Sequence, residues 1–330
     1  MVCCKHILCL CAVQKLLLLV FAAFAALFLF TACGDDSPIP GLGGRAPAQQ
    51  EHREPRPVVS PLQVLVPRTG EVYLQENGVT IDTSNLSEGY VMVRYEGDAG
   101  RAVAQVEKVG VTYTYELNVN GEWEVLPLSE GNGSYTITVL EHVHDQMFAI
   151  LLSTTVDVTL RHHTLPFLHP NQFVNFHSGS NAVALAASLA QGATSELEVV
   201  ENIYRFIIEN IEYDDDFAMS IVEGQVINYL PDIDATLASG RGICFDYAAL
   251  MTAMIRAQMI PARLDIGYVS GGLFHAWISI YTEETGWIGM VAFNGSEWAL
   301  LDPTFSAGGN SPELAAFIGD GTNYQVMFMH

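Results

Sequence analysis

The stretch from Cys244 to Met259, "CFDYAALMTAMIRAQM", carries apolar residues on nearly every side of a helix. Pro261 follows it, and proline cannot continue a helix, so the pattern predicts a helix that begins at or near Cys244 and ends before Pro261. A helix that is apolar around its whole circumference has to be buried. The fold must therefore surround this segment with other helices or with a sheet.

The chain on either side of this helix can provide such surroundings. The segment "ELEVVENIYRFIIENI" (196–211) has apolar residues at helical spacing, and Thr194 or Ser195 is placed to cap its start. Strand-like runs follow the buried helix: "RLDIGYV", "HAWISIY", "WIGMVAF" and "WALLDP". Helices followed by strands predict an α+β domain over 163–330, with the helix packed on an antiparallel sheet.

Residues 59–162 have a different pattern, which consists of short alternating runs separated by turn residues. The runs are rich in Tyr, Val, Thr and Ile, and turn signals at Asn120-Gly121 and at 131–133 divide them. These features predict a small all-β, sandwich-like domain, and no catalytic constellation is visible in it. We expect this domain to recruit substrate or to position the domain that follows.

The first 58 residues are typical of an exported, membrane-tethered protein. Lys5 and Lys15 precede or border the apolar run 16–30, which is shorter than the roughly 20 residues that a spanning helix needs. "FTAC" (30–33) resembles a bacterial lipoprotein processing box, although Phe30 stands where leucine is commonest. This predicts a lipoprotein signal peptide over 1–32, lipidation at Cys33, and a flexible tether over 33–58 that is rich in Pro, Gly and charge. The alternative is an uncleaved anchor helix. The expected location in both cases is extracytoplasmic, and for the lipoprotein it is attachment to the cell membrane.

The charge of the chain narrows the classes of partner. The formal net charge is −23, whereas nucleic-acid binding requires a basic face, so we exclude a nucleic-acid partner. Solubility in an exposed compartment explains the excess of acid better than attraction of a basic partner.

Cys244 is the one cysteine that would remain beside Cys33 after removal of the signal peptide. Gly240 and Gly242 allow a tight turn before it, and the first residue of a buried helix lies where unpaired N–H groups favour an anion. This position suits a thiolate nucleophile, whereas an inert cysteine would fit better on the packing face in the middle of the helix. Composition alone leaves both interpretations open.

A thiolate nucleophile needs a base and a group that orients the base. His275 opens the strand-like run "HAWISIY", and Asp302 ends "EWALLDP", where Pro303 stops the strand. Either residue alone is more often structural. Together, in the order Cys244, His275, Asp302, they are consistent with a catalytic triad.

Three blocks carry a resemblance to a known family: "GRGICFDYAALMTAMIRAQMIPARLDIGYV", "FHAWISIY" and "EWALLDPTF". In sequence, spacing and order they resemble the transglutaminase-like superfamily, whose members are papain-like cysteine enzymes. The resemblance covers roughly residues 175–330. It implies that Cys244 is the nucleophile, His275 its base and ion-pair partner, and Asp302 the residue that orients the imidazole. The signal peptide, tether and β domain resemble those of exported bacterial members more loosely.

The family reaction is acyl transfer, in which the thiolate attacks an amide or peptide carbonyl and forms a thioester. If water then attacks the thioester, the protein is a protease or amidase; if a lysine amine attacks it, the protein is a cross-linker. The sequence leaves both reactions open for a protein or peptide substrate. Lys108 is the only lysine after Lys15, which disfavours self-cross-linking. Tyr213, in "NIEYDDDFA" (210–218), is our candidate for a second oxyanion donor, against a plain packing role.

Other clusters carry weaker hypotheses. Asp214, Asp215 and Asp216 could bind calcium, but they lack the glycine-spaced loop of a dedicated site, so a solvated acidic loop is favoured. Zinc-site spacing is also absent from His142, His144, His162, His163, His169 and His177, and we expect neither a metal nor a cofactor. The rival to an enzyme is an inactive surface-binding lipoprotein on the same scaffold.

Overall fold

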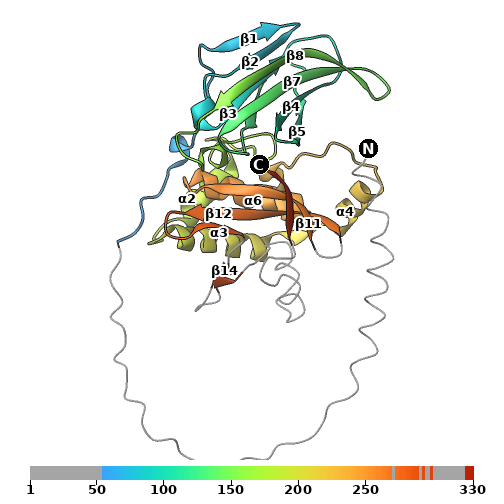
Figure 1. Ribbon diagram of the computed structural model, residues 1–330. Helices are drawn as coiled ribbons and strands as arrows, with labels where there is room; N and C mark the ends of the chain where they lie inside the picture. Colours follow the sequence, from blue (N-terminus) through green and yellow to red (C-terminus); the bar gives the residue numbers. More distant parts are fainter. Residues whose placement is uncertain (1–53, 270–271, 290–291, 294–297, 300–323) are drawn as a thin grey trace, which may run out of the picture.

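The computed structural model describes residues 54–269, 272–289, 292–293, 298–299 and 324–330. These residues form a β-rich part, which is uppermost in Figure 1, and a mixed helix-and-sheet part below it. Each part has a hydrophobic core of its own. The α+β class predicted for the chain is confirmed, with a β-rich region before the helices.

The β-rich part consists of two four-stranded antiparallel sheets whose inner faces share one core. The first sheet has the order β1-β2-β3-β6, and the second has the order β5-β4-β7-β8. Alternation of buried and exposed residues places Tyr95, Tyr115, Tyr135 and Ile137 between the sheets. The strands of the first sheet are β1 (Tyr73–Glu76), β2 (Val79–Asp82), β3 (Tyr90–Tyr95) and β6 (Trp123–Pro127), and those of the second are β4 (Ala102–Lys108), β5 (Val111–Leu117), β7 (Gly133–His144) and β8 (Met147–Val158).

The helices of the second part gather around α6 (Cys244–Ala257), which is buried from Asp246 onward. Ser195 caps α3 as one of the two predicted residues, since its hydroxyl accepts the Glu198 N–H at 3.1 Å. The core places Ile203 and Ile207 of α3 with Leu250 and Met254 of α6. The other helices are α2 (Asn181–Leu189), α3 (Glu196–Asn210), α4 (Asp215–Val222) and α5 (Ile233–Ser239).

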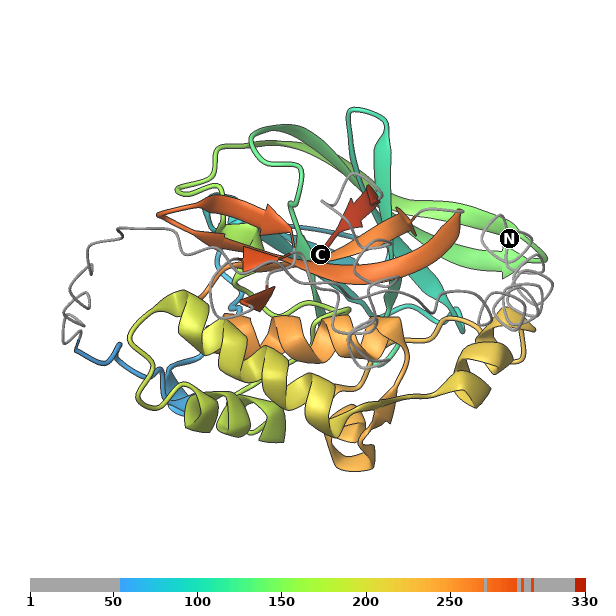
Figure 2. The same ribbon diagram turned by 90° about the horizontal axis from the view of Figure 1, so that it is seen from below.

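An antiparallel sheet of order β13-β12-β11-β16 packs against these helices, which lie along one side of it in Figure 2. Its strands are β11 (Ala262–Val269), β12 (Leu273–Thr282), β13 (Gly286–Gly289) and β16 (Gln325–Met329). Two short pairs complete the described strands: β9 (Glu212–Tyr213) with β10 (Arg241–Gly242), and β14 (Ala292–Phe293) with β15 (Trp298–Ala299). Three short 3₁₀ segments lie at Pro61–Gln63, Leu86–Glu88 and Leu165–Phe167.

Arg256, near the end of α6, fastens three separate segments together. Its guanidinium is buried and donates to the carbonyls of Ala262 at 2.8 Å, His169 at 2.7 Å and His330 at 2.6 Å. His330 in turn packs against Tyr115 of the sandwich, with ring centroids 5.9 Å apart. The end of β16 is therefore fixed between the two parts of the molecule.

The chain that leads into the folded part is attached to the same end of α6. Arg56 donates to the Gln258 carbonyl at 2.9 Å, and the Gln258 amide exchanges two hydrogen bonds with the backbone of Val59, at 3.0 and 3.1 Å. Val64 is buried in the core of the second part rather than in the sandwich. Among the described residues, no helix is both long and apolar enough to cross a membrane.

Candidate functional site

Cys244 is the first residue of α6, and its free thiol is half-buried. Ile243 is the residue that caps the helix, with an extended backbone at φ −98° and ψ 178°. The backbone N–H of Ile243 donates to the Asp246 carboxylate at 2.9 Å. A thiol at this place lies at the start of the helix, where the unpaired N–H groups of the first turn concentrate positive potential.

The short ladder between β9 and β10 places Tyr213 opposite the residues that lead into Cys244. The strands are parallel, with Tyr213 level with Gly242, and the Asp214 N–H donates to the Gly242 carbonyl at 3.0 Å. The Arg241 side chain also pairs with Asp214 at 3.2 Å. Residues far apart in sequence are thereby fixed side by side at the start of α6.

Tyr213 is 37% exposed, yet its surroundings raise the pKa of the phenol. Burial is the largest cause, followed by the negative charges that Cys244 and Asp215 carry when ionised. The pairing of Tyr213 with Gly242 places it near the start of α6. Because the pKa is raised above its usual value of 10, the hydroxyl stays protonated near neutral pH and can donate a hydrogen bond.

His275 is near the start of β12 and is 3% exposed. It pairs across the sheet with Gly267 of β11, and its ring stacks on Trp277 with centroids 6.2 Å apart and planes 18° apart. The sheet strand β12 packs directly against α6, and the half-buried Cys244 contacts the core that contains Ala276 and Trp277. Cys244 and His275 therefore lie on neighbouring elements. Asp302 and Cys33 lie outside the described residues.

A buried polar group on the same sheet was not anticipated from sequence. Asp265 is fully buried, accepts the Ser279 hydroxyl at 2.5 Å, and pairs with Arg263 at 3.1 Å. Burial raises the pKa of the Asp265 carboxyl, although Arg263 and Ser279 oppose this effect. Trp277 stands directly across from Asp265. The group therefore supports the strand pair that carries His275.

Two further residues near the start of α6 were also not identified from the sequence. Asp246 is 2% exposed, and besides Ile243 it binds the Tyr229 hydroxyl at 2.5 Å. The position of Asp246, three residues after the helix cap, is a capping pattern that could have revealed its role. No pattern in the sequence connects Tyr229 with it.

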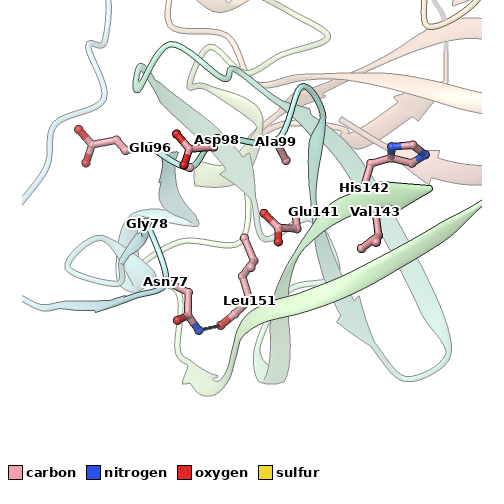
Figure 3. Close-up of a pocket in the computed structure, with 10 residues that line it drawn as sticks. Asn77, Gly78, Glu96, Asp98, Ala99, Glu141, His142, Val143 and Leu151 are labelled. Carbon is pink, nitrogen blue, oxygen red and sulfur yellow. Dashed lines mark hydrogen bonds between the residues drawn. The ribbon is translucent and has the colours of Figure 1, made fainter.

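Two hollows differ in their relation to the thiol. The nearer one, of about 230 Å³, is lined by Asp214, Tyr229, Asp232, Arg241 and Asp246, among others, at the starts of α4, α5 and α6. The larger one, of about 730 Å³, lies in the sandwich. Figure 3 shows Glu96, Asp98, Glu141 and His142 around it, with the Asn77 amide bound to the Leu151 carbonyl at 2.8 Å. All of its lining residues belong to the β-rich part, which does not carry Cys244, so its size does not make it the chemical centre.

The acidic run after Tyr213 has a structural role in the fold. Asp214 caps α4 by accepting the Phe217 N–H at 3.0 Å, and Asp215 and Asp216 occupy the first turn, where carboxylates are favoured. Within the described ranges, no group of three or more His, Cys, Asp or Glu side chains could hold a metal ion.

Comparison with known proteins identifies the family of the region that carries Cys244 and His275. The model of the transglutaminase-like superfamily matches residues 183–292, which run from α2 through the thiol and the His275 strand. Residues 183–292 belong to the transglutaminase-like superfamily. The presence of this transglutaminase-like domain indicates a papain-like cysteine enzyme in general. No curated protein matches the chain.

Two solved structures are similar to the chain at low identity. One is a candidate cysteine protease from Cytophaga hutchinsonii, with 19% identity and a TM-score of 0.34, covering 71% of this chain and 78% of that one. The other is a candidate protease from Parabacteroides distasonis, with 12% identity and a TM-score of 0.28, covering 64% of this chain and 62% of that one.

Proposed function

We propose that the transglutaminase-like domain catalyses acyl transfer on a protein or peptide substrate, with Cys244 as nucleophile. The observation that supports this most is the position of a half-buried free thiol at the first residue of the buried helix α6. The N–H groups there stabilise an anion. His275, on the adjacent strand, is the base, and Asp302 orients its imidazole.

The proposed reaction has two steps. The Cys244 thiolate attacks the carbonyl carbon of an amide, and a C–S bond replaces the C–N bond as the His275 imidazolium gives its proton to the leaving amine. The carbonyl oxygen carries negative charge in between, and Tyr213 and the first N–H groups of α6 donate to it. A second nucleophile then gives its proton to His275, attacks the thioester and releases the thiolate.

Water or an amine can be the second nucleophile, and the two outcomes define a protease or amidase and a transamidase. We favour hydrolysis or a separate amine partner, because Lys108 is the only lysine after Lys15. We further propose that the chain is exported and held at the membrane through a lipid on Cys33. Its substrate would then be at the cell envelope.

The test measures alkylation of the thiol by iodoacetamide across pH, read by mass spectrometry of the peptide that contains Cys244. An activated thiolate should react well below pH 8, and His275→Gln should abolish that low-pH reaction while leaving the protein folded. Reaction that rises only as the pH approaches about 8.5, as for an ordinary thiol, would overturn the assignment. A Cys244→Ser variant controls for labelling elsewhere in the peptide.

A further inference from the structure

Three helices begin around the hollow that Gly242 and Asp246 line, and an aspartate binds the start of each. Asp214 caps α4 by accepting the Phe217 N–H. Asp232 caps α5 by accepting the N–H groups of Asp234 and Ala235 at 3.1 and 2.9 Å. Asp246 lies in the first turn of α6, and its carboxylate accepts the N–H of Ile243, the residue before the helix. It is also the most buried of the three.

Asp246 holds the backbone on the N-terminal side of the thiol. The N–H that it accepts belongs to Ile243, the residue directly before Cys244, at 2.9 Å. The carboxylate side chain also packs over Gly242, where an added Cβ would meet the Asp246 Cβ at 2.7 Å. The Gly242 carbonyl is bound from the other side by the Asp214 N–H, so the loop before the sulfur is held from two directions.

Tyr229 fixes the second oxygen of the same carboxylate. Its hydroxyl donates to Asp246 Oδ1 at 2.5 Å, and its ring lies edge-on to Phe217, with centroids 4.9 Å apart. Burial and then Asp246 raise the pKa of Tyr229, so the phenol remains a donor near neutral pH. With both oxygens bound, the carboxylate cannot rotate, and the Ile243 N–H has one fixed partner.

We propose that Asp246, held by Tyr229, is a positioning residue that sets the backbone at Ile243 and Cys244 so that the sulfur faces its histidine. This inference rests on the proposed function. Asp246 contacts neither substrate nor the reacting sulfur in this role, and it acts only through the Ile243 N–H.

The pH profile of Cys244 alkylation in the full chain tests this role, because charge and position predict opposite changes. Removing a negative charge near the sulfur favours the thiolate, so Asp246→Ala would speed alkylation at pH 6 if Asp246 acted by charge. If Asp246 acts by positioning, Asp246→Ala lets the backbone at Cys244 shift and separates the sulfur from the imidazole. We therefore expect alkylation at pH 6 to slow about tenfold, toward the rate of an ordinary thiol.

Other variants separate this effect from a loss of stability. Tyr229→Phe should slow the reaction in the same direction by a smaller factor, and Asp246→Asn, which keeps an acceptor for Ile243, should recover most of it. Asp232→Ala is the matched control: it removes the cap of α5 and should lower the melting temperature without changing the alkylation profile.

The outcomes distinguish this inference from the proposed function. A wild-type thiol that reacts at low pH, together with Asp246→Ala and Tyr229→Phe variants that react equally fast, overturns only the positioning role. A wild-type thiol that is inert at low pH overturns both. If Asp246→Ala does not fold, the Tyr229→Phe profile decides.

Discussion

The Tyr213 phenol is the residue beside the thiol whose chemical state is most clearly fixed. Burial and then the charge of Cys244 raise its pKa, so it remains a hydrogen-bond donor at neutral and mildly alkaline pH. We predict that Tyr213→Phe slows acylation of Cys244 by about a hundredfold, which is the usual cost of losing one oxyanion donor. The slowing should be the same from pH 6 to pH 8, because the phenol does not titrate there.

Two reagents can isolate this contribution. An activated ester such as p-nitrophenyl acetate reacts through an oxyanion, whereas iodoacetamide reacts by displacement at a saturated carbon and forms none. Tyr213→Phe should therefore slow release of p-nitrophenol and leave alkylation unchanged. Equal slowing of both reactions would show that Tyr213 serves the thiol itself or the local fold, and equal rates in both would exclude it from the site.

Individual site residues differ in how far sequence could identify them. Cys244 and His275 stand in motifs whose residue types and order indicate their chemistry, although their proposed roles remain to be tested. Asp265 could not be identified, because its importance depends on which strands pair and on its burial between them. Tyr229 contacts Asp246 only through a fold that brings two distant segments together.

Among the elements, β11 has the strictest local requirement, at Gly267. An added Cβ there would lie 1.9 Å from the Gln325 carbonyl oxygen and 3.0 Å from the Met327 nitrogen, and the pairing of β11 with β16 shifts register at this point. We predict that Gly267→Ala pushes β16 away and lowers the free energy of unfolding by about 1–3 kcal/mol, as overpacking does.

The measurement is thermal or urea unfolding of Gly267→Ala beside a matched glycine. Gly100 has nothing within 4 Å of an added Cβ, so Gly100→Ala should change stability by less than about 0.5 kcal/mol. A Gly267→Ala protein as stable as Gly100→Ala would mean that β16 is not held closely at this position.

Elements with a strong apolar period were predicted well, and those fixed by long-range contact were not. The helices at 196–210 and 244–257 and the strand pair β11–β12 follow from spacing and flanking signals. The pair β9–β10 is only two residues long on each side, too short for any pattern, and its ladder forms between segments almost thirty residues apart. The strands β1, β2 and β4 and the helices α2, α4 and α5 also escaped sequence interpretation, because they are short or rich in small and polar residues.

At the scale of the whole molecule, two buried histidines lie where the two parts meet. Neither ring nitrogen of His169 has a hydrogen-bond partner within the part of the chain that the structure describes, and its ring packs on Tyr90 of the sandwich, with centroids 4.7 Å apart. Burial, then Arg256 and Arg161, lower the pKa of His169 to about 4. Burial and then Arg256 lower the pKa of His330 to about 3.

These shifts predict a loss of stability in mild acid. In the unfolded chain each histidine is protonated below about pH 6.5. In the folded protein His169 is protonated only below about pH 4 and His330 only below about pH 3. Stability therefore falls as the pH falls through that window, by about 2 kcal/mol per histidine between pH 6.5 and pH 5.

The melting temperature at pH 7 and pH 5 checks this prediction. His169→Phe keeps the ring contact with Tyr90 and removes the titration, so its melting temperature should fall less between the two pH values than that of the wild type. Replacing the exposed His144 in the same way should leave the wild-type difference unchanged. A His169→Phe protein with the full acid sensitivity would contradict the assignment.

The attachment of Arg56 and Val59 to Gln258 has a consequence for where chemistry can occur. That attachment lies at the C-terminal end of α6, and Cys244 lies at the opposite end. A helix rises 1.5 Å per residue, so α6 is a rigid spacer of about 20 Å. If the upstream chain is attached to a membrane through the flexible tether predicted over 33–58, the tether limits how far the sulfur can reach from the membrane but does not fix its height. Substrates would then be restricted to those within that reach.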